Sequence, residues 1–239
     1  MADHNMKMEG VQITWFGHAT FRIISPQGKI LLIDPWTLHN PACPPALKRV
    51  DRVDVMLITH AHSDHAGDAV EIATATKPTV VAIVELAGWL DSRGVENTMG
   101  MNKGGSVTID GIKITMTHAI HTSGAEDGSY AGEACGYVIE FENGHKLYHA
   151  GDTCAFSDMQ LINELYRPDV ALLPIGDYYT MGPREAAVAV RMLGVQHVIP
   201  MHYKTFPILT GTPAELREAL KQLGLDNVEV IEMQPGQTI

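Results

Sequence analysis

Short apolar runs separated by turn residues fill the first part of the chain. Apolar side chains dominate segments 11–16, 21–24 and 29–33, and glycine or proline lies between neighbouring segments. Runs of this length between such residues are typical of β-strands. The pattern therefore predicts a group of N-terminal strands, followed by a proline-rich loop at 40–45.

From residue 53 onward, short apolar runs alternate with segments of helical periodicity. The predicted strands are 53–58, 79–84, 107–109, 112–117, 136–141, 145–149, 170–174, 198–200 and 228–231. The predicted helices are 66–76, 86–92, 156–166, 184–193 and 213–223. Hairpins followed by alternating strands and helices indicate sheets covered by helices, a layered α/β architecture.

The last of these helices has the clearest ends. Thr212 is a candidate N-cap, Pro213 occupies the first helical position, and Glu215 completes a capping box. Gly224 follows the last apolar position, where glycine commonly ends a helix.

Length and composition are those of an ordinary globular protein. The chain has 239 residues, of which 45% are hydrophobic and 19% charged, enough for one sizeable core. It contains no internal repeat and no long polar linker. We therefore expect residues 1–239 to form a single domain.

The net charge of the chain indicates which kind of partner to expect. The formal net charge is −11, and no Lys/Arg run concentrates the positive charge. Such a chain repels phosphate backbones, so nucleic acid is disfavoured and a small-molecule substrate is expected. A homo-oligomer is left open.

The apolar segments, the N-terminus and the cysteines indicate the cellular compartment. No segment approaches the ~20 consecutive apolar residues of a membrane span, and the polar N-terminus does not resemble a secretory signal. The three cysteines, Cys43, Cys135 and Cys154, are widely spaced and odd in number, which fits a reducing compartment. We expect a cytoplasmic protein without a membrane anchor.

The strongest chemical signal follows predicted strand 53–58. His60, His62, Asp64 and His65 lie within six residues. In an extended segment, His60 and His62 point to the same side and can reach one metal ion. A turn after them lets Asp64 and His65 face a neighbouring position. The alternative is a solvated histidine-rich loop.

Further histidines and an aspartate follow other predicted strands. His118 and His121 come at the end of strand 112–117, Asp152 after strand 145–149, and His202 after strand 198–200. Loops at the carboxyl ends of strands are where ligands gather in α/β proteins. Each of these residues alone would more often be an ordinary surface or core residue, but together they predict one shared site.

These motifs resemble those of the metallo-β-lactamase superfamily. The run THAHSDH at 59–65 resembles its HxHxDH motif, and the remaining motifs follow in order: AIHTSG at 119–124, HAGDT at 149–153 and IPMHYKTFP at 199–207. Three further segments resemble a branch of uncharacterised metal-dependent hydrolases that is similar to ascorbate-6-phosphate lactonases. They are TWFGHATF at 14–21, ILLIDPW at 30–36 and PIGDYYTMGPREAA at 174–187.

The resemblance implies an αββα sandwich, with two mixed β-sheets flanked by helices, and a binuclear metal site. It assigns His60, His62 and His121 to a first metal ion, assigns Asp64, His65 and His202 to a second, and makes Asp152 the bridge. His118 is the alternative to His121. Zinc is the favoured ion, with manganese or nickel as alternatives, because di-iron relatives carry a glutamate at the position of His62.

The resemblance also implies a hydrolase. Two metal ions about 3.5–4 Å apart lower the pKa of a shared water from 15.7 to about 7, which provides a hydroxide nucleophile at neutral pH. The predicted substrate is a small ester, lactone or phosphorylated metabolite. A phosphodiesterase or nuclease, and a non-hydrolytic metal or redox protein, are the alternatives.

Four residues have predicted roles around this chemistry. Asp64 would ligate a metal ion and orient the nucleophile, and His18 would contact substrate at the rim, donate a proton or add a metal ligand. Tyr203 and Lys204 directly follow His202 and would hold an anionic group of the substrate. For His18 the alternative is a locally bonded turn histidine, and for Lys204 an exposed surface amine.

Overall fold

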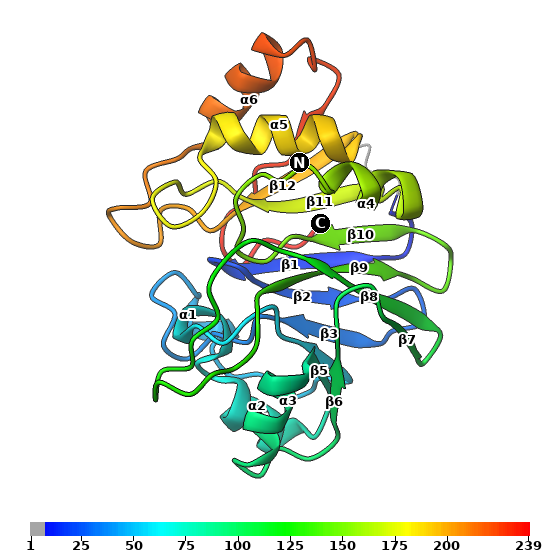
Figure 1. Ribbon diagram of the computed structural model, residues 1–239, viewed down its shortest axis with the longest axis vertical. Helices are drawn as coiled ribbons and strands as arrows, with labels where there is room; N and C mark the ends of the chain where they lie inside the picture. The colour runs from blue at the N-terminus through cyan, green and yellow to red at the C-terminus, as the bar shows by residue number, and fades with distance from the viewer. Residues whose placement is uncertain (1–7) are drawn as a thin grey trace.

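The computed structural model describes residues 8–239 and shows two β-sheets packed between two groups of helices (Figure 1). Helices α4, α5 and α6 cover one side of the strands, α2 and α3 cover the other, and the short helix α1 lies beside the strand ends. The predicted αββα sandwich is confirmed. Residues 1–7, part of the segment in which no secretory signal is expected, lie outside the described residues.

The first sheet has six strands in the order in which they occur along the chain. They are β1 Gln12–Gly17, β2 Thr20–Ile24, β3 Ile30–Ile33, β4 Val55–Leu57, β5 Thr79–Ile83 and β6 Thr98–Met101. The first three pair antiparallel, whereas β3 to β6 pair in parallel. Strands β3 to β5 are almost wholly buried, as expected where a parallel sheet is covered on both faces.

The second sheet has seven strands in the order β13-β12-β11-β10-β9-β8-β7. They are β7 Ser106–Ile109, β8 Ile112–His118, β9 Cys135–Glu140, β10 Lys146–His149, β11 Val170–Pro174, β12 His197–Met201 and β13 Glu229–Val230. Strands β7 to β10 pair antiparallel, and β10 to β13 pair in parallel. Both sheets are therefore mixed.

The helices pack against the outer faces of the sheets through their apolar sides. They are α1 Ser63–Ala66, α2 Ala69–Thr76, α3 Val84–Asp91, α4 Met159–Tyr166, α5 Pro183–Leu193 and α6 Pro213–Gln222, with a 3-10 turn at Pro45–Leu47. Helix α5 lies between α4 and α6 and contacts β11. The predicted capping box of α6 is present: Thr212 Oγ1 accepts from the Glu215 N–H, and Glu215 Oε2 accepts from the Thr212 N–H.

Two differences from the predicted elements stand out. The predicted helix 66–76 begins only at Ala69, as α2, and Gly67 and Asp68 separate it from the short helix α1, which was not predicted. The Asp68 carboxylate instead accepts the N–H groups of Thr37 and Leu38 and so holds the loop after β3. Strand β6 was not predicted, because its sequence Thr-Met-Gly-Met is only partly buried and carries no strong strand signal.

The end of the chain returns to the first sheet. Ile239 and Ile13 exchange two backbone hydrogen bonds, and Thr14 and Thr238 form an antiparallel bridge. Within residues 8–239, no helix combines the length and the apolar character that a bilayer crossing requires.

Candidate metal centre

The predicted ligands converge at one edge of the sandwich, beyond the carboxyl ends of strands from both sheets. The loop after β4 and helix α1 supply His60, His62, Asp64 and His65, while the loops after β8, β10 and β12 supply His121, Asp152 and His202. The structure thus brings these distant segments of the chain together, as the prediction of one shared site requires.

Asp152 occupies the centre of the group. Its Oδ2 lies 3.0 Å from His202 Nε2, 3.2 Å from His65 Nε2, 3.6 Å from His121 Nε2 and 3.9 Å from His60 Nε2. One carboxylate oxygen thus faces histidines from three separate parts of the chain. The structure thus brings Asp152 together with four of the predicted histidine ligands.

The first group consists of His60, His62 and His121, whose ligand atoms lie within 4.8 Å of one another. His60 Nε2 lies 3.1 Å from His62 Nδ1. The two side chains point to the same side of an extended segment, as the spacing predicts. His62 thus presents Nδ1, and His60 presents Nε2.

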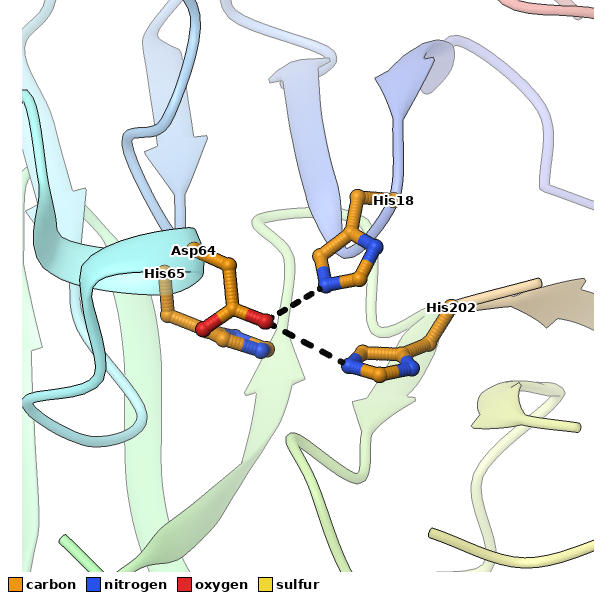
Figure 2. A group of neighbouring side chains, drawn as sticks. All are labelled: His18, Asp64, His65 and His202. Atoms are coloured by element: carbon orange, nitrogen blue, oxygen red, sulfur yellow. Dashed lines mark hydrogen bonds and ion pairs between the residues drawn. The ribbon is translucent and has the colours of Figure 1, made fainter. Parts of the chain in front are cut away.

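The second group consists of His18, Asp64, His65 and His202 (Figure 2). Their side chains point toward one another from the turn between β1 and β2, from helix α1 and from the end of β12. Asp64 Oδ2 lies 3.0 Å from His18 Nε2 and 3.8 Å from His202 Nε2.

Hydrogen bonds behind the group orient two of the histidines. The Nδ1–H of His65 donates to Asp34 Oδ2 over 2.8 Å. Thr59 Oγ1 donates to the same carboxylate and accepts from His60 Nδ1 at 3.0 Å. Both bonds place the ring proton on Nδ1 and leave the Nε2 lone pair facing the cluster, which is the usual arrangement of a ligating histidine.

Several buried ring and carboxylate atoms of the cluster make no well-formed hydrogen bond. Among the described residues, His65 Nε2, His202 Nε2 and Asp152 Oδ1 are buried without a well-formed hydrogen bond. Unpaired buried polar atoms are costly and call for an explanation. Imidazole and carboxylate donors that face one another without hydrogen bonds fit a bound divalent cation.

The electrostatics of the site favour the ligating protonation states. Burial lowers the pKa of His60 well below its usual range, and it also lowers the pKa of His62 and of His121. Neutral imidazole is the form that binds metal ions. Burial alone would raise the pKa of Asp152, but neighbouring His202 and His65 outweigh it and hold that pKa well below its usual range.

When no cation is bound, the pKa of His65 shifts in the opposite direction to those of His60, His62 and His121. Burial acts to lower its pKa, but the carboxylates of Asp152 and Asp34 outweigh that effect and raise the pKa well above its usual range. A proton on Nε2 of His65 then takes the place that a cation would take. Metal binding at this nitrogen therefore displaces a proton.

His118 lies away from the cluster. Its side chain contacts the ring of Phe156, and its Nδ1 lies 3.1 Å from Lys103 Nζ. Strand β8 ends at His118, and three more residues of loop are needed to reach the site. His121, and not His118, is therefore the histidine that the structure brings to Asp152.

His18, Tyr203 and Lys204 lie differently from the sequence-based picture. His18 is fully buried behind Asp64 and not at a rim. Tyr203 is buried and stacks on Trp15, and Tyr203 and Lys204 line a separate cavity of about 200 Å³. The predicted role of these two residues in holding an anionic group remains a prediction.

A larger cavity of about 620 Å³ opens directly above the cluster. His62, Asp64, His121, Asp152 and His202 form its base. Trp36, Tyr179, Phe206 and Ile208 form its walls. Among residues 8–239, no lysine or arginine lines this cavity.

Four residues of the site have no individual prediction from the sequence: Asp34, Thr59, Trp36 and Phe206. Asp34 directly follows β3, so the rule that ligand-binding groups follow strands would have included it. Thr59 precedes the histidine motif and gave no separate signal. The two aromatic residues lie in loops, where sequence pattern does not predict which cavity a side chain lines.

Comparison with known proteins agrees with this geometry. Residues 29–203 match the model of the beta-lactamase superfamily domain. A metal-dependent hydrolase of family UPF0173 from Koribacter versatilis is 54% identical over 98% of this chain and 99% of its own length. Another from Rubrobacter xylanophilus is 52% identical, with 96% of each chain covered.

A solved structure is similar over the same extent. It is a metallo hydrolase from the archaeon Ignicoccus hospitalis, 39% identical, with a TM-score of 0.83 over 96% of this chain and 97% of that one. The particular likeness to ascorbate-6-phosphate lactonases remains a prediction. The chain belongs to the UPF0173 metal-dependent hydrolases of the metallo-β-lactamase superfamily.

Proposed function

We propose that this metal-dependent hydrolase holds two divalent cations and cleaves a small ester or lactone that carries an apolar group. The observation that carries the proposal is the position of Asp152, whose Oδ2 lies within 3.9 Å of four histidine nitrogens. A carboxylate so placed suits a bridge between two cations. His60, His62 and His121 would hold the first cation, and Asp64, His65 and His202 the second.

When bound, such a cation pair supplies a hydroxide nucleophile at neutral pH and polarises the oxygen of the bond under attack. The chain's own residues would position the reactants. Asp64 lines the cavity and lies in the second group, so it is placed both to ligate and to orient the nucleophile. The donor set favours zinc, with manganese or nickel as alternatives.

The walls of the cavity support the choice of substrate class. Trp36, Phe206 and Ile208 offer apolar surface next to the cluster, and the cavity of about 620 Å³ admits a small molecule. Recognition of a phosphate group away from the metal ions normally uses arginine or lysine. Because neither lines this cavity in the described residues, an uncharged ester or lactone fits it better than a phosphorylated metabolite.

The test combines metal analysis with a substrate screen. Protein purified without added metal is analysed for bound ions and assayed on a panel of aryl esters, lactones, phosphomonoesters and phosphodiesters. We expect two ions per chain and turnover of an ester or lactone. Two bound ions with no turnover on the panel would favour a non-hydrolytic metal protein, and cleavage of DNA or RNA at low salt would favour a nuclease.

A further inference from the structure

We propose that His18 is an additional ligand of the second metal position, so that this position has more protein donors than the first. The inference rests on the proposed binuclear site and adds to it a residue from a different part of the fold. Its support comes from the placement of the ring, from the hydrogen bond behind the ring, and from the backbone that carries it.

The ring of His18 is directed into the second group (Figure 2). Its ligand nitrogen lies, together with those of His65 and His202 and a carboxylate oxygen of Asp64, in a set whose members are all within 4.8 Å of one another. His18 Nε2 is 3.0 Å from Asp64 Oδ2. This separation suits two ligands of one cation as well as it suits a hydrogen bond.

The far side of the His18 ring has a polar partner, as it does in His60 and His65. His18 Nδ1 lies 2.9 Å from Thr205 Oγ1, just as Nδ1 of His60 meets Thr59 and Nδ1 of His65 meets Asp34. The Thr205 hydroxyl can accept from an Nδ1–H, and a ring proton on Nδ1 would leave the Nε2 lone pair for a metal ion. His18 therefore resembles His60 and His65 in having a side-chain oxygen against Nδ1 and in presenting Nε2 to the cluster.

The backbone at His18 is constrained in an unusual way. His18 has a φ of 57° and His202 a φ of 55°, in the left-handed region that non-glycine residues rarely adopt. The His18 carbonyl accepts from both the His202 N–H and Trp15 Nε1, each at 3.0 Å. Conformations of this kind persist where the surrounding structure imposes them, and they gather at functional sites.

The inference makes the two metal positions unequal. The first has three histidines and Asp152, which together are four donors and suit tetrahedral zinc. The second has three histidines, Asp64 and Asp152, which together are five donors. Five protein donors exceed the tetrahedral set, so this position is better suited than the first to a five-coordinate ion or to the alternatives nickel and manganese.

The competing interpretation is that His18 only donates a hydrogen bond from Nε2 to Asp64 and so positions that ligand. The two interpretations differ in what His18→Gln does. Its side-chain amide reaches about as far as imidazole Nε2 and keeps an N–H donor for Asp64, but it has no ring nitrogen to bind the ion and no ring N–H to give a shifted signal.

Cobalt(II) provides the readouts, because its visible absorption reports coordination number and its unpaired electrons shift the N–H proton of each ligating imidazole. In the cobalt-loaded wild-type protein we expect two ions per chain and six exchangeable, strongly shifted ring N–H signals. They come from His18, His60, His62, His65, His121 and His202. Five such signals in a protein with two bound ions would overturn the inference and leave the proposed function standing.

In His18→Gln we expect one of the six signals to disappear. One ion should bind at least tenfold more weakly, or stay bound with a several-fold stronger visible absorption as its coordination number falls. His118→Gln, a histidine outside the cluster, should match wild type. If His18→Gln kept all the signals and the wild-type absorption, His18 would have a hydrogen-bonding role only. A folded wild-type protein that binds no cobalt would contradict the proposed function itself.

Discussion

The Nδ1–H of His65 donates to the carboxylate of Asp34 across 2.8 Å, on the side of the ring that faces away from the cluster. Asp34 is fully buried, and its oxygens also accept from the N–H and the hydroxyl of Thr59. One carboxylate therefore sets the ring orientation of His65 and, through Thr59, that of His60.

Replacement of Asp34 by Asn should weaken metal binding without removing a ligand. All three groups that face Asp34 are donors, so an amide N–H₂ would oppose at least one of them. Changes in hydrogen-bond partners of metal ligands typically cost about 10- to 100-fold in affinity. Competition with a chromophoric chelator measures the effect. Asp54→Asn is the matched control, because Asp54 accepts the Ile30 N–H at the opposite end of β3. Equal affinities in the two variants would contradict the role of Asp34.

Asp152→Ala should lose both metal ions and all turnover. The change removes the carboxylate that lies between the two groups of histidines and leaves four ring nitrogens without their common neighbour. Metal analysis and the ester assay measure the two losses. Asp226→Ala, at an exposed aspartate after α6, should behave as wild type. Full metal content in Asp152→Ala would show that the bridging assignment is wrong.

Phe206→Ala should raise KM for an ester with an apolar acyl or aryl group and leave kcat nearly unchanged. The side chain forms part of the cavity wall and is not in the ligand cluster. Loss of a hydrophobic contact of this size is worth roughly 1–3 kcal/mol, or about 5- to 150-fold in KM. An acetate ester of the same leaving group serves as the comparison substrate and should change less. An equal rise for both esters would argue against an apolar subsite at Phe206.

A chelator should lower the thermal midpoint of the protein. At a free ion concentration of 100 times Kd, a bound ion stabilises the folded state by about 2.7 kcal/mol, which for a chain of this size corresponds to roughly 5–10 °C. Scanning calorimetry before and after removal of the ions, and after zinc or manganese is restored, measures the change. An unchanged midpoint after verified removal would mean that the cluster is not a metal site of appreciable affinity.

Thr212→Ala should destabilise the protein by about 1 kcal/mol through loss of the α6 cap. Thr212 Oγ1 accepts from the Glu215 N–H at 3.2 Å, so alanine leaves that donor to solvent. Thr212→Ser keeps the hydroxyl and should restore most of the loss. Urea unfolding followed by circular dichroism gives the comparison, and metal content should stay the same in both variants.

The local sequence pattern was sufficient to predict features that depend only on residues close together along the chain. The α6 capping box and the His60–His62 pair follow from spacing alone, and the structure has both. The rule that ligands follow strands pointed to His118, His121, Asp152 and His202, and the structure brings the last three together. These predictions needed only the period of a strand and the edge at which strands end.

Other features depend on contacts between distant segments, which spacing does not encode. His18 is buried because the β1–β2 turn folds beneath α1 and the end of β12, and nothing in Gly17-His18-Ala19 indicates this. Tyr203 follows a ligand but turns toward Trp15 and away from the cluster. In the same way, Asp68 interrupts a helical pattern to hold a loop that lies thirty residues earlier.

The division of the cluster between the two sheets has a consequence for assembly. The segment through β6 carries His18, His60, His62, Asp64 and His65, and the segment from β7 onward carries His121, Asp152 and His202. Neither segment alone contains a full ligand set for either cation. Each bound ion would link the two segments. When the chain is cut in the loop between β6 and β7, the two fragments should therefore bind each other with higher affinity in the presence of zinc than in its absence.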